Sequence, residues 1–296
     1  MKFGFVSLIG RPNAGKSTLL NRIVGQKVAI VSDKPQTTRN RILGVKNYAE
    51  GQVVLMDTPG IHRPLHRMNV RMVNMAVETM READVVGLVH DVTAPPGGGE
   101  RYMIDLVEAL RGPLVLVLNK VDRVAKPRLL PLIERMSRLA RFDDIVPVSA
   151  LTGDNVGRLE RVFLGHLPDG EPMYPPDYVT DQPETFFVAE TVREQVLAHT
   201  HRELPFSTAV VVDSLGEPDA RGVMTIYCTI LVERESQKPI VVGRGGEMIK
   251  AIGTAARAEL ERVFGSRVFL DLRVKLRDRW REDERVLDQL GLGPSR

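Results

Sequence analysis

The chain has 296 residues, of which 43% are hydrophobic and 27% are charged, and its formal net charge is +3. These values are ordinary for a globular protein. The longest apolar stretches, such as residues 85–89 and 114–118, are far shorter than the about 20 residues of a membrane span, which excludes a transmembrane segment. Cys228 is the only cysteine, which excludes an internal disulfide and favours a reducing compartment such as the cytoplasm.

The length predicts two domains, because one hydrophobic core rarely grows beyond roughly 250–300 residues. In the first half, short apolar runs alternate with helix-like segments. The predicted strands are residues 3–9, 53–56, 85–89, 114–118 and 145–148. The predicted helices are residues 16–24, 68–80, 101–110, 127–139 and 156–164. This alternation predicts an α/β fold with a doubly wound, mostly parallel sheet. A hairpin at residues 41–56 adds one antiparallel strand to it.

The second half has a different order of elements. Prolines at positions 168, 172, 175, 176 and 183 predict a stiff, acidic linker over residues 168–183. The elements predicted after it are a helix at 184–199, strands at 207–213 and 223–233, a helix at 247–263, a strand at 268–276 and a helix at 282–290. This order is typical of a smaller α+β domain. The predicted organisation is therefore a first domain at 1–167, a linker at 168–183 and a second domain at 184–296.

The charges of the second half are unevenly distributed. Residues 169–233 contain 3 Lys and Arg against 12 Asp and Glu, whereas residues 234–281 contain 12 against 6. A basic segment beside an acidic one is typical of an anion-binding face. A solvated surface with interspersed charges explains the same counts equally well, so charge alone leaves both interpretations open.

Residues 10–17 read GRPNAGKS and fit the pattern G-x-x-x-x-G-K-[ST] between a predicted strand and a predicted helix. In such a loop the backbone N–H groups and the helix N-terminus converge on phosphates. We expect Lys16 to reach the β- and γ-phosphates and Ser17 to ligate Mg²⁺. The residues expected to surround the phosphates are Asn13, Ala14, Gly15, Lys16, Ser17 and Thr18.

Residues 57–60 read DTPG and follow the predicted strand 53–56. There Asp57 is placed to hold Mg²⁺ through a water, and the N–H of Gly60 is placed to sense a γ-phosphate. In isolation the same four residues would indicate an ordinary turn. Their distance after a phosphate-binding loop favours the nucleotide site.

A threonine pair lies between these two motifs, in the segment PQTTR at residues 35–39. A hydroxyl here completes the Mg²⁺ shell only while the γ-phosphate is present, which orders the loop and releases it on hydrolysis. We predict that Thr38 supplies it, with Thr37 as the alternative. The residues expected to act in catalysis are therefore Lys16, Thr38, Asp57 and Gly60.

Residues 119–122 read NKVD and follow the predicted strand 114–118. A carboxylate at Asp122 accepts from two donors on one edge of guanine, and adenine lacks both. We expect Lys120 to lie along the base and Asn119 to join this loop to the phosphate loop. Ser149 and Ala150 follow the strand 145–148, and the Ala150 N–H is placed to donate to guanine O6. The predicted nucleotide is GTP, with GDP as the product.

This ordered set of motifs resembles the translation-factor-like class of GTPases. Where Ras-like enzymes place a water-orienting glutamine after the DTPG motif, this chain has Ile61, so we expect slow intrinsic turnover. Members of the class with asparagine at the position of Asn13 bind K⁺ beside the phosphates, and the resemblance therefore implies a K⁺ ligand. The competing interpretation is that Asn13 only shapes the loop.

The second domain contains a G-x-x-G motif. Residues 240–242 are apolar and predict a short strand before Gly243, and a helix follows. Two glycines allow a nucleic-acid backbone to come close, although a tight turn explains the motif nearly as well. The order of elements and the basic segment match a type II KH domain, which clamps about four nucleotides of single-stranded RNA. The residues expected to contact RNA are Gly243, Arg244, Gly245, Gly246 and Lys250.

The combination of this GTPase motif set, a proline-containing linker and a KH domain resembles the Era family of bacterial ribosome-assembly GTPases. The resemblance covers nearly the whole chain, including residues 231–234 and residues 280–285 around Trp280. It implies binding to the 3′ region of small-subunit ribosomal RNA and to the immature small subunit, and peripheral contact with the cell membrane. We expect a monomer that acts in the cytoplasm.

The sequence leaves two functional hypotheses. In the first, GTP orders the loops around Thr38 and Gly60 and favours a domain arrangement that exposes the G-x-x-G face to RNA. In the second, the chain is a GTPase that acts on protein partners at the membrane, and the KH-like domain is a scaffold.

Overall fold

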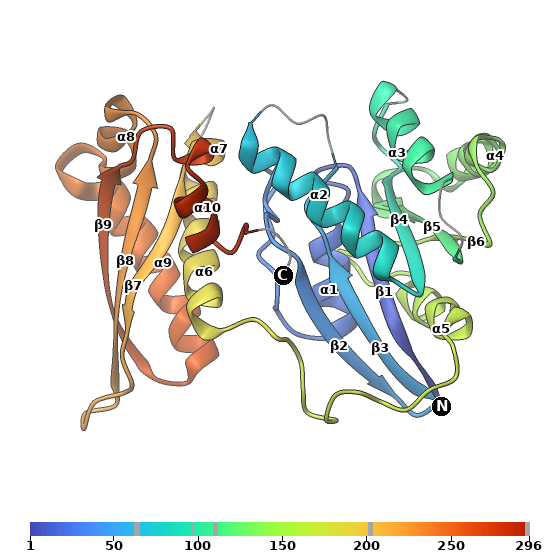
Figure 1. Cartoon of the computed structure of the whole chain (residues 1–296), viewed down its shortest axis with the longest axis horizontal. Coiled ribbons are helices and arrows are strands. Elements are labelled where there is room, and N and C mark those ends of the chain that lie inside the picture. The colour runs from blue at the N-terminus through green and yellow to red at the C-terminus, as the bar shows by residue number, and fades with distance from the viewer. Residues whose placement is uncertain (62–65, 96, 109–111, 201–203, 294–296) are drawn as a thin grey trace. The chain divides into compact units, whose positions relative to one another are not determined.

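The computed structural model describes residues 1–61, 66–95, 97–108, 112–200 and 204–293 (Figure 1). The chain divides into two compact units. Most of the first 181 residues form one unit, and residues 182–296 form the main part of the other. None of the described helices is long and apolar enough to cross a membrane.

The first unit is built on a six-stranded sheet with the order β2-β3-β1-β4-β5-β6. All neighbouring pairs are parallel except β2 and β3, which form the antiparallel hairpin. Its strands are β1 (Lys2–Gly10), β2 (Ile42–Tyr48), β3 (Gly51–Asp57), β4 (Val85–Asp91), β5 (Leu114–Asn119) and β6 (Asp144–Pro147). The predicted doubly wound, mostly parallel fold with one antiparallel strand is confirmed.

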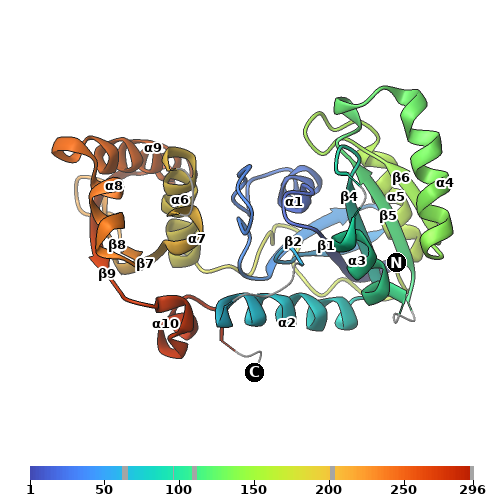
Figure 2. The same cartoon turned by 90° about the horizontal axis from the view of Figure 1, so that it is seen from above.

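Helices cover both faces of this sheet, which is why its central strands are apolar throughout. The helices are α1 (Lys16–Val24), α2 (Arg67–Glu82), α3 (Gly98–Glu108), α4 (Leu129–Leu139) and α5 (Val156–His166). Side chains from α2, α3 and α4 form one buried cluster with Leu88, Leu116 and Leu118 of the strands. The helices α1 and α5 contact the sheet from the other side, and Figure 2 shows α1 and α2 on opposite faces.

The chain after α5 runs along the first sheet, where residues 168–170 contact the start of β1 and residues 174–180 contact the edge strand β2 and its partner β3. The N–H of Val45 in β2 donates to the carbonyl of Val179 over 2.8 Å, and Oγ1 of Thr180 donates to the carbonyl of Leu43 over 2.6 Å. The rings of Tyr174 and Tyr178 stack 4.8 Å apart and pack against the same apolar cluster as β2. An edge strand presents unpaired backbone groups. The segment predicted as a linker supplies partners for some of them, although it forms no regular helix or strand.

The second unit is a three-stranded sheet with the order β7-β8-β9 and two long helices on one face. Its elements are α6 (Glu184–His199), α7 (Leu204–Ser207), β7 (Ala209–Leu215), β8 (Val223–Val232), α8 (Lys238–Val242), α9 (Glu247–Phe264), β9 (Arg267–Leu276) and α10 (Glu284–Gln289). Val188, Val192 and Val196 of α6 and Ile252, Ala256 and Leu260 of α9 are buried against alternate residues of β8. The predicted smaller α+β domain is confirmed.

The predicted strand at residues 240–242 is wrong, because these residues belong to helix α8. Pro239 lies in the first turn, where its missing N–H costs nothing and its fixed φ favours a helix. Gln237 lies at the N-cap of this helix, and its side-chain oxygen accepts hydrogen bonds from the N–H groups of Glu233 and Arg234. A run of three apolar residues is too short to show a helical period, so the sequence pattern could not separate the two possibilities.

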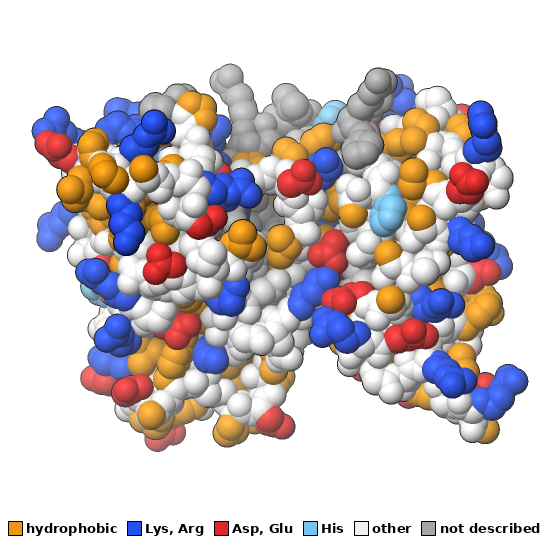
Figure 3. Space-filling view, turned by 180° about the vertical axis from the view of Figure 1, so that it is seen from behind, with side chains coloured by type: hydrophobic (Ala, Val, Ile, Leu, Met, Phe, Trp, Pro, Cys, Tyr) orange, Lys and Arg blue, Asp and Glu red, His pale blue; other side chains and the backbone are white. Residues whose placement is uncertain are grey.

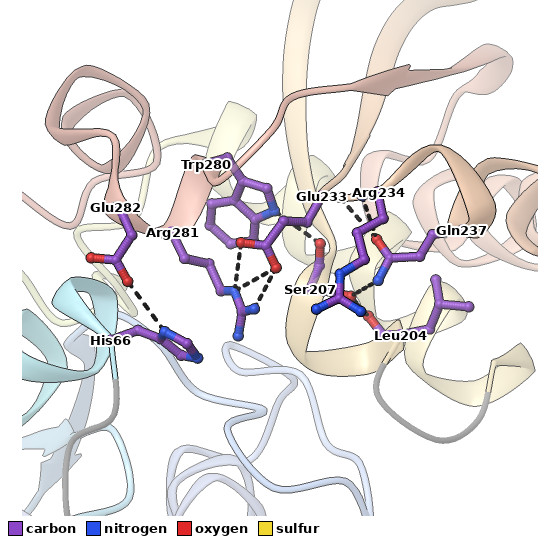
Figure 4. Close-up of polar contacts among 9 residues, drawn as sticks. All are labelled: His66, Leu204, Ser207, Glu233, Arg234, Gln237, Trp280, Arg281 and Glu282. Atoms are coloured by element: carbon purple, nitrogen blue, oxygen red, sulfur yellow. Dashed lines mark hydrogen bonds and ion pairs between the residues drawn. The ribbon is translucent and has the colours of Figure 1, made fainter.

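A buried tryptophan joins the C-terminal segment to the rest of the second unit (Figure 4). The indole Nε1 of Trp280 donates to the carbonyl of Ser207 over 2.8 Å, and the side chain is fully buried. Nε2 of Gln237 donates to Oγ of the same serine over 2.9 Å. The guanidinium of Arg281 pairs with the carboxylate of Glu233. The start of α8 and the chain after β9 are therefore held on one set of contacts.

Substitution of Trp280 should destabilise the second unit. We expect Trp280→Ala to cost about 3–5 kcal/mol, because it leaves a large cavity. Trp280→Phe should cost about 1–3 kcal/mol, because it mainly leaves the Ser207 carbonyl without its donor. Hydrogen exchange of the β8 amides in the full-length chain measures this free energy, and the β1 amides serve as the internal control. Exchange in β8 equal to that of the unchanged chain for both variants would contradict the role given to this residue.

Candidate functional site

The phosphate-binding loop lies between the end of β1 and the start of α1. Gly15 occupies the N-cap position with φ 94°, a conformation that favours glycine, and it supplies no capping side chain. A Cβ added at Gly15 would lie 2.3 Å from Nδ2 of Asn119, so a side chain here would displace the neighbouring motif. The first N–H groups of α1 therefore point toward a site with no competing side-chain acceptor at the cap, which suits a phosphate.

Lys16 and Asp57 are two opposite charges buried beside this loop. Nζ of Lys16 lies 3.4 Å from the carbonyl oxygens of Gly10 and Arg11. Burial lowers the pKa of Lys16, and the charge of Asp57 opposes that shift. Burial likewise raises the pKa of Asp57, and Lys16 opposes it together with hydrogen bonds from two hydroxyls. Each group is thus short of compensating charge, as expected where a phosphate and a cation bind.

Three oxygen-bearing side chains converge on one point. Oγ of Ser17 donates to Oδ2 of Asp57 over 2.5 Å and lies 2.7 Å from Oγ1 of Thr38. Oγ1 of Thr38 in turn donates to the same carboxylate oxygen over 3.2 Å. The other oxygen, Oδ1, is buried without a hydrogen-bond partner among the described residues. Two hydroxyls and a carboxylate with a spare oxygen fit the ligand preference of Mg²⁺.

The first residues after β3 pack against the phosphate loop. A Cβ at Gly60 would lie 2.7 Å from the backbone of Pro12, so only glycine allows this approach. The N–H of Ile61 donates to the carbonyl of Gly10 over 3.1 Å. Its side chain is buried in the cluster under α2 and α3 and is chemically unable to orient a water.

The predicted base-recognition residues also come together. Nδ2 of Asn119 donates to the carbonyl of Ala14 over 2.8 Å, which joins this loop to the phosphate loop. Oδ1 of Asp122 accepts from Oγ of Ser149 over 2.5 Å. The N–H of Ala150, which the sequence assigns to guanine O6, donates here to Oδ1 of Asn119 over 2.9 Å. A bound base would therefore share that donor with Asn119.

Two further residues support this loop and were not predicted. Asp91 ends β4 directly opposite Asn119 in the register, and its Oδ2 accepts from Nζ of Lys120 over 2.6 Å. Its place two residues after the predicted strand 85–89 is a signal that could have identified it. Nε of Arg22 donates to the carbonyl of Ala150 over 3.1 Å. No sequence pattern marks an arginine on α1 for contact with a loop 128 residues away.

A cavity of about 1060 Å³ adjoins the phosphate loop. Its lining includes Pro12, Asn13, Gln36, Ile61 and His90. Within the described residues its lining also includes Ala14 of the phosphate loop and Asp91, the partner of Lys120.

The G-x-x-G motif forms the turn between α8 and α9. Gly243, Gly245 and Gly246 all have positive φ, and a Cβ at Gly243 would lie 2.6 Å from Cβ of Met248. Gly245 is exposed, with open space on its Cα, so another backbone can approach it closely. Arg244 and Lys250 are exposed, and within the described part of the chain neither has an ion-pair partner.

Basic and acidic side chains are interspersed on the face seen in Figure 3, opposite to the view of Figure 1. The uneven charge counts of the second half therefore do not produce a single-signed surface there.

Comparison with known proteins identifies the family of this chain. A family model described as a 50S ribosome-binding GTPase matches residues 5–120, and a KH domain model matches residues 203–281. The GTPase Era of Geotalea daltonii is 49% identical over 288 residues, which cover 97% of each chain. The chain belongs to the Era family of GTPases. The Era protein of Heliobacterium modesticaldum is 43% identical and covers 98% of this chain and 97% of its own.

Two solved structures extend this comparison. A single-residue variant of Aquifex aeolicus Era bound to GDP and AlF₄⁻ is 39% identical, with a TM-score of 0.95, and covers 99% of this chain and 100% of its own. An Era in complex with MgGDPNP and nucleotides 1506–1542 of 16S ribosomal RNA is 38% identical, with a TM-score of 0.96 and the same coverage. The chain is a GTPase that uses GTP, GDP and Mg²⁺.

Asp122→Asn should lower GTP affinity by about 100-fold or more, because two hydrogen bonds to a charged acceptor contribute about 1.5–3 kcal/mol each. Xanthosine triphosphate, which offers an acceptor in place of one donor, should bind this variant better than GTP. Equilibrium titration with fluorescent nucleotides measures both affinities. Asp154→Asn is the matched control, since Asp154 is an exposed carboxylate in the neighbouring loop. Unchanged GTP affinity of Asp122→Asn would refute the assignment.

Thr38→Ala should slow single-turnover GTP hydrolysis about 10- to 100-fold and leave GDP affinity unchanged, because this hydroxyl matters only with the γ-phosphate present. Thr37→Ala tests the alternative threonine. The structure brings the Thr38 hydroxyl within hydrogen-bonding distance of both Ser17 and Asp57. A larger effect from Thr37→Ala than from Thr38→Ala would reverse the choice.

Proposed function

We propose that this chain is a GTP-dependent switch that binds the 3′ region of small-subunit ribosomal RNA and acts in the cytoplasm in maturation of the small ribosomal subunit. The observation that carries the proposal is that one chain brings Ser17, Thr38 and Asp57 together beside the phosphate loop and also holds an open G-x-x-G turn. The likeness to the Era complex with MgGDPNP and 16S ribosomal RNA over 99% of the chain supports it.

In the proposed GTP site, Lys16 binds the β- and γ-phosphate oxygens and neutralises the charge that develops on them. Ser17, Thr38 and Asp57 hold Mg²⁺, the first two directly and the third through a water. The ion, when bound, bridges phosphate oxygens and stabilises their charge. The N–H of Gly60 donates to the γ-phosphate, and Asp122 accepts from guanine. The backbone of residues 13–18 surrounds the phosphates.

Turnover is slow in this proposal because the chain positions few groups around the attacking water. Ile61 is buried in an apolar cluster and has no amide to orient it. Catalysis therefore depends on positioning and on the charges of Lys16 and the metal site. A partner that supplies a further polar group would raise the rate.

Asn13 is the proposed K⁺ ligand. It has φ 63°, a left-handed conformation that asparagine adopts more readily than most residues, so its geometry also fits the competing loop-shaping role. We expect GTP turnover to be several-fold higher in K⁺ than in Na⁺ at equal ionic strength, and Asn13→Ala to remove the difference. Equal turnover of the unchanged chain in the two salts would remove the K⁺ proposal and leave the loop-shaping role.

The proposed RNA site is the G-x-x-G turn. Open space above Gly245 accommodates the backbone of a single strand, while Arg244 and Lys250 pair with its phosphates. Gly243 and Gly246 set the turn, and their positive φ values would strain any other residue. In the GTP state the ordered loops around Thr38 and Gly60 favour the arrangement in which this turn is open to RNA. A coupling free energy between nucleotide and RNA binding is typically about 1–3 kcal/mol. It corresponds to a difference of roughly 5- to 150-fold in RNA affinity between the GTP and GDP states.

The test is the affinity for an RNA with the sequence of nucleotides 1506–1542 of 16S ribosomal RNA, measured at fixed salt with GDPNP or with GDP. We expect tighter binding with GDPNP, and loss of at least about 10-fold in Gly245→Asp, because the new charge repels phosphate. Gly222→Asp is the matched control: Gly222 also has positive φ and open space on its Cα, but it lies before β8. Equal losses in both variants would contradict a specific site. No binding by the unchanged chain would favour the alternative, a GTPase that acts on protein partners.

A further inference from the structure

The strand β9 has two chemically distinct faces. Val268, Leu270, Leu272 and Val274 pack against the core with α6 and α9. The alternate residues, beginning with Arg267 and ending with Lys275, lie on the opposite face. On β8 the same rule applies, since Met224, Ile226, Cys228, Ile230 and Val232 are buried in the core and Tyr227 lies between them. The face away from the helices is therefore expected to be polar.

Two aromatic rings interrupt this polar face. Phe269 of β9 is 52% exposed and Tyr227 of β8 is 36% exposed. Their ring centroids lie 6.4 Å apart with an interplanar angle of 68°, so each holds the other in an edge-to-face pair. The pair is not needed to fill the core, which lies on the other side of the sheet. It presents flat apolar surface to solvent, on a rigid strand pair rather than on a loop.

Arg267 lies two positions before Phe269 on this face of β9, whereas Asp271 lies opposite Tyr227 in the register. Arg267, Arg273 and Lys275 are exposed on β9, while Asp271 is the one acidic residue at the intervening positions of that strand. Nε of Arg273 lies 3.4 Å from Oδ1 of Asp271, which leaves Arg267 and Lys275 as the cations at the two ends of the strand. Exposed aromatic faces on a strand face with three cations and one acidic residue suit unpaired bases and their phosphates. A protein partner would instead favour a wider apolar patch.

We propose that this face, defined by Tyr227, Phe269, Arg267 and Lys275, is a second RNA contact on which an unpaired base stacks. The proposal rests on the proposed function, since it assumes that the G-x-x-G turn binds single-stranded RNA. Because α8 and α9 both contact β9, which is an edge strand, the turn and the aromatic face lie on two sides of one strand. The turn accounts for about four nucleotides. A longer strand is required to reach the second face.

The length of the RNA separates the two contacts. We expect Phe269→Ala to weaken binding of the RNA spanning nucleotides 1506–1542 about 5- to 150-fold, the range for loss of one stacked base. Binding of a tetranucleotide should not change. Phe269→Tyr should bind the long RNA as tightly as the unchanged chain does. Phe269→Leu should bind it as weakly as Phe269→Ala does, because leucine has no aromatic face. Val263→Ala is the matched control: Val263 is 43% exposed on α9, away from this face.

Photocrosslinking gives an independent readout. With 5-iodouridine in the long RNA, crosslinks are expected at Phe269 or Tyr227 as well as near the turn. Crosslinks confined to residues 243–250, or equal affinity of Phe269→Ala and the unchanged chain, would overturn the second contact and leave the proposed function standing. Full affinity of Phe269→Leu would also overturn it in favour of an apolar docking surface. Failure of the unchanged chain to bind either RNA would instead contradict the proposed function itself.

Discussion

The carboxylate of Asp57 is the constraint on which the nucleotide site depends. It is buried at the end of a parallel strand, it accepts from Ser17 and Thr38, and one of its oxygens has no partner within the described structure. A buried carboxylate is costly unless charge compensates it. Lys16 compensates it only in part, so the site gains when a cation and a phosphate arrive. Because Thr38 belongs to a loop and Ser17 to α1, their shared contact on this group connects the loop to the helix.

The parallel sheet explains why the remaining groups meet at the same place. The C-terminal ends of neighbouring parallel strands lie along one edge, and β1, β3, β4 and β5 end there in the phosphate loop, Asp57, Asp91 and Asn119. In the second unit, two side chains bond to one serine. Gln237 and Trp280 hold the start of α8 and the chain after β9 against Ser207.

Much of this architecture could be predicted because its signals are local. The strands and helices of the first unit follow apolar runs, and the nucleotide-binding motifs stand at the ends of those runs. Ser17, Thr38 and Asp57 lie together as expected, and Asn119 contacts the phosphate loop. Residues 240–242 form a helix with Pro239 in its first turn, and three apolar residues are too few to show its period. Two other features depend on tertiary contacts that no window of sequence contains. Arg22 reaches Ala150 across 128 residues, and residues 174–180 lie along the β2–β3 hairpin because the edge strand has unpaired backbone groups. The exposure of Phe269 likewise depends on which face of β9 packs against the helices.

In the proposed function, nucleotide state and RNA binding are coupled through the contact of Thr38 with Asp57. Linkage requires the coupling to be reciprocal, so RNA must change nucleotide preference by the same factor by which nucleotide changes RNA affinity. The most direct measurement is the ratio of GDPNP to GDP affinity with and without saturating RNA, in the unchanged chain and in Thr38→Ala. The account predicts that RNA shifts this ratio toward GDPNP in the unchanged chain and leaves it unchanged in the variant. The same shift in both chains, or no shift in either, would contradict it.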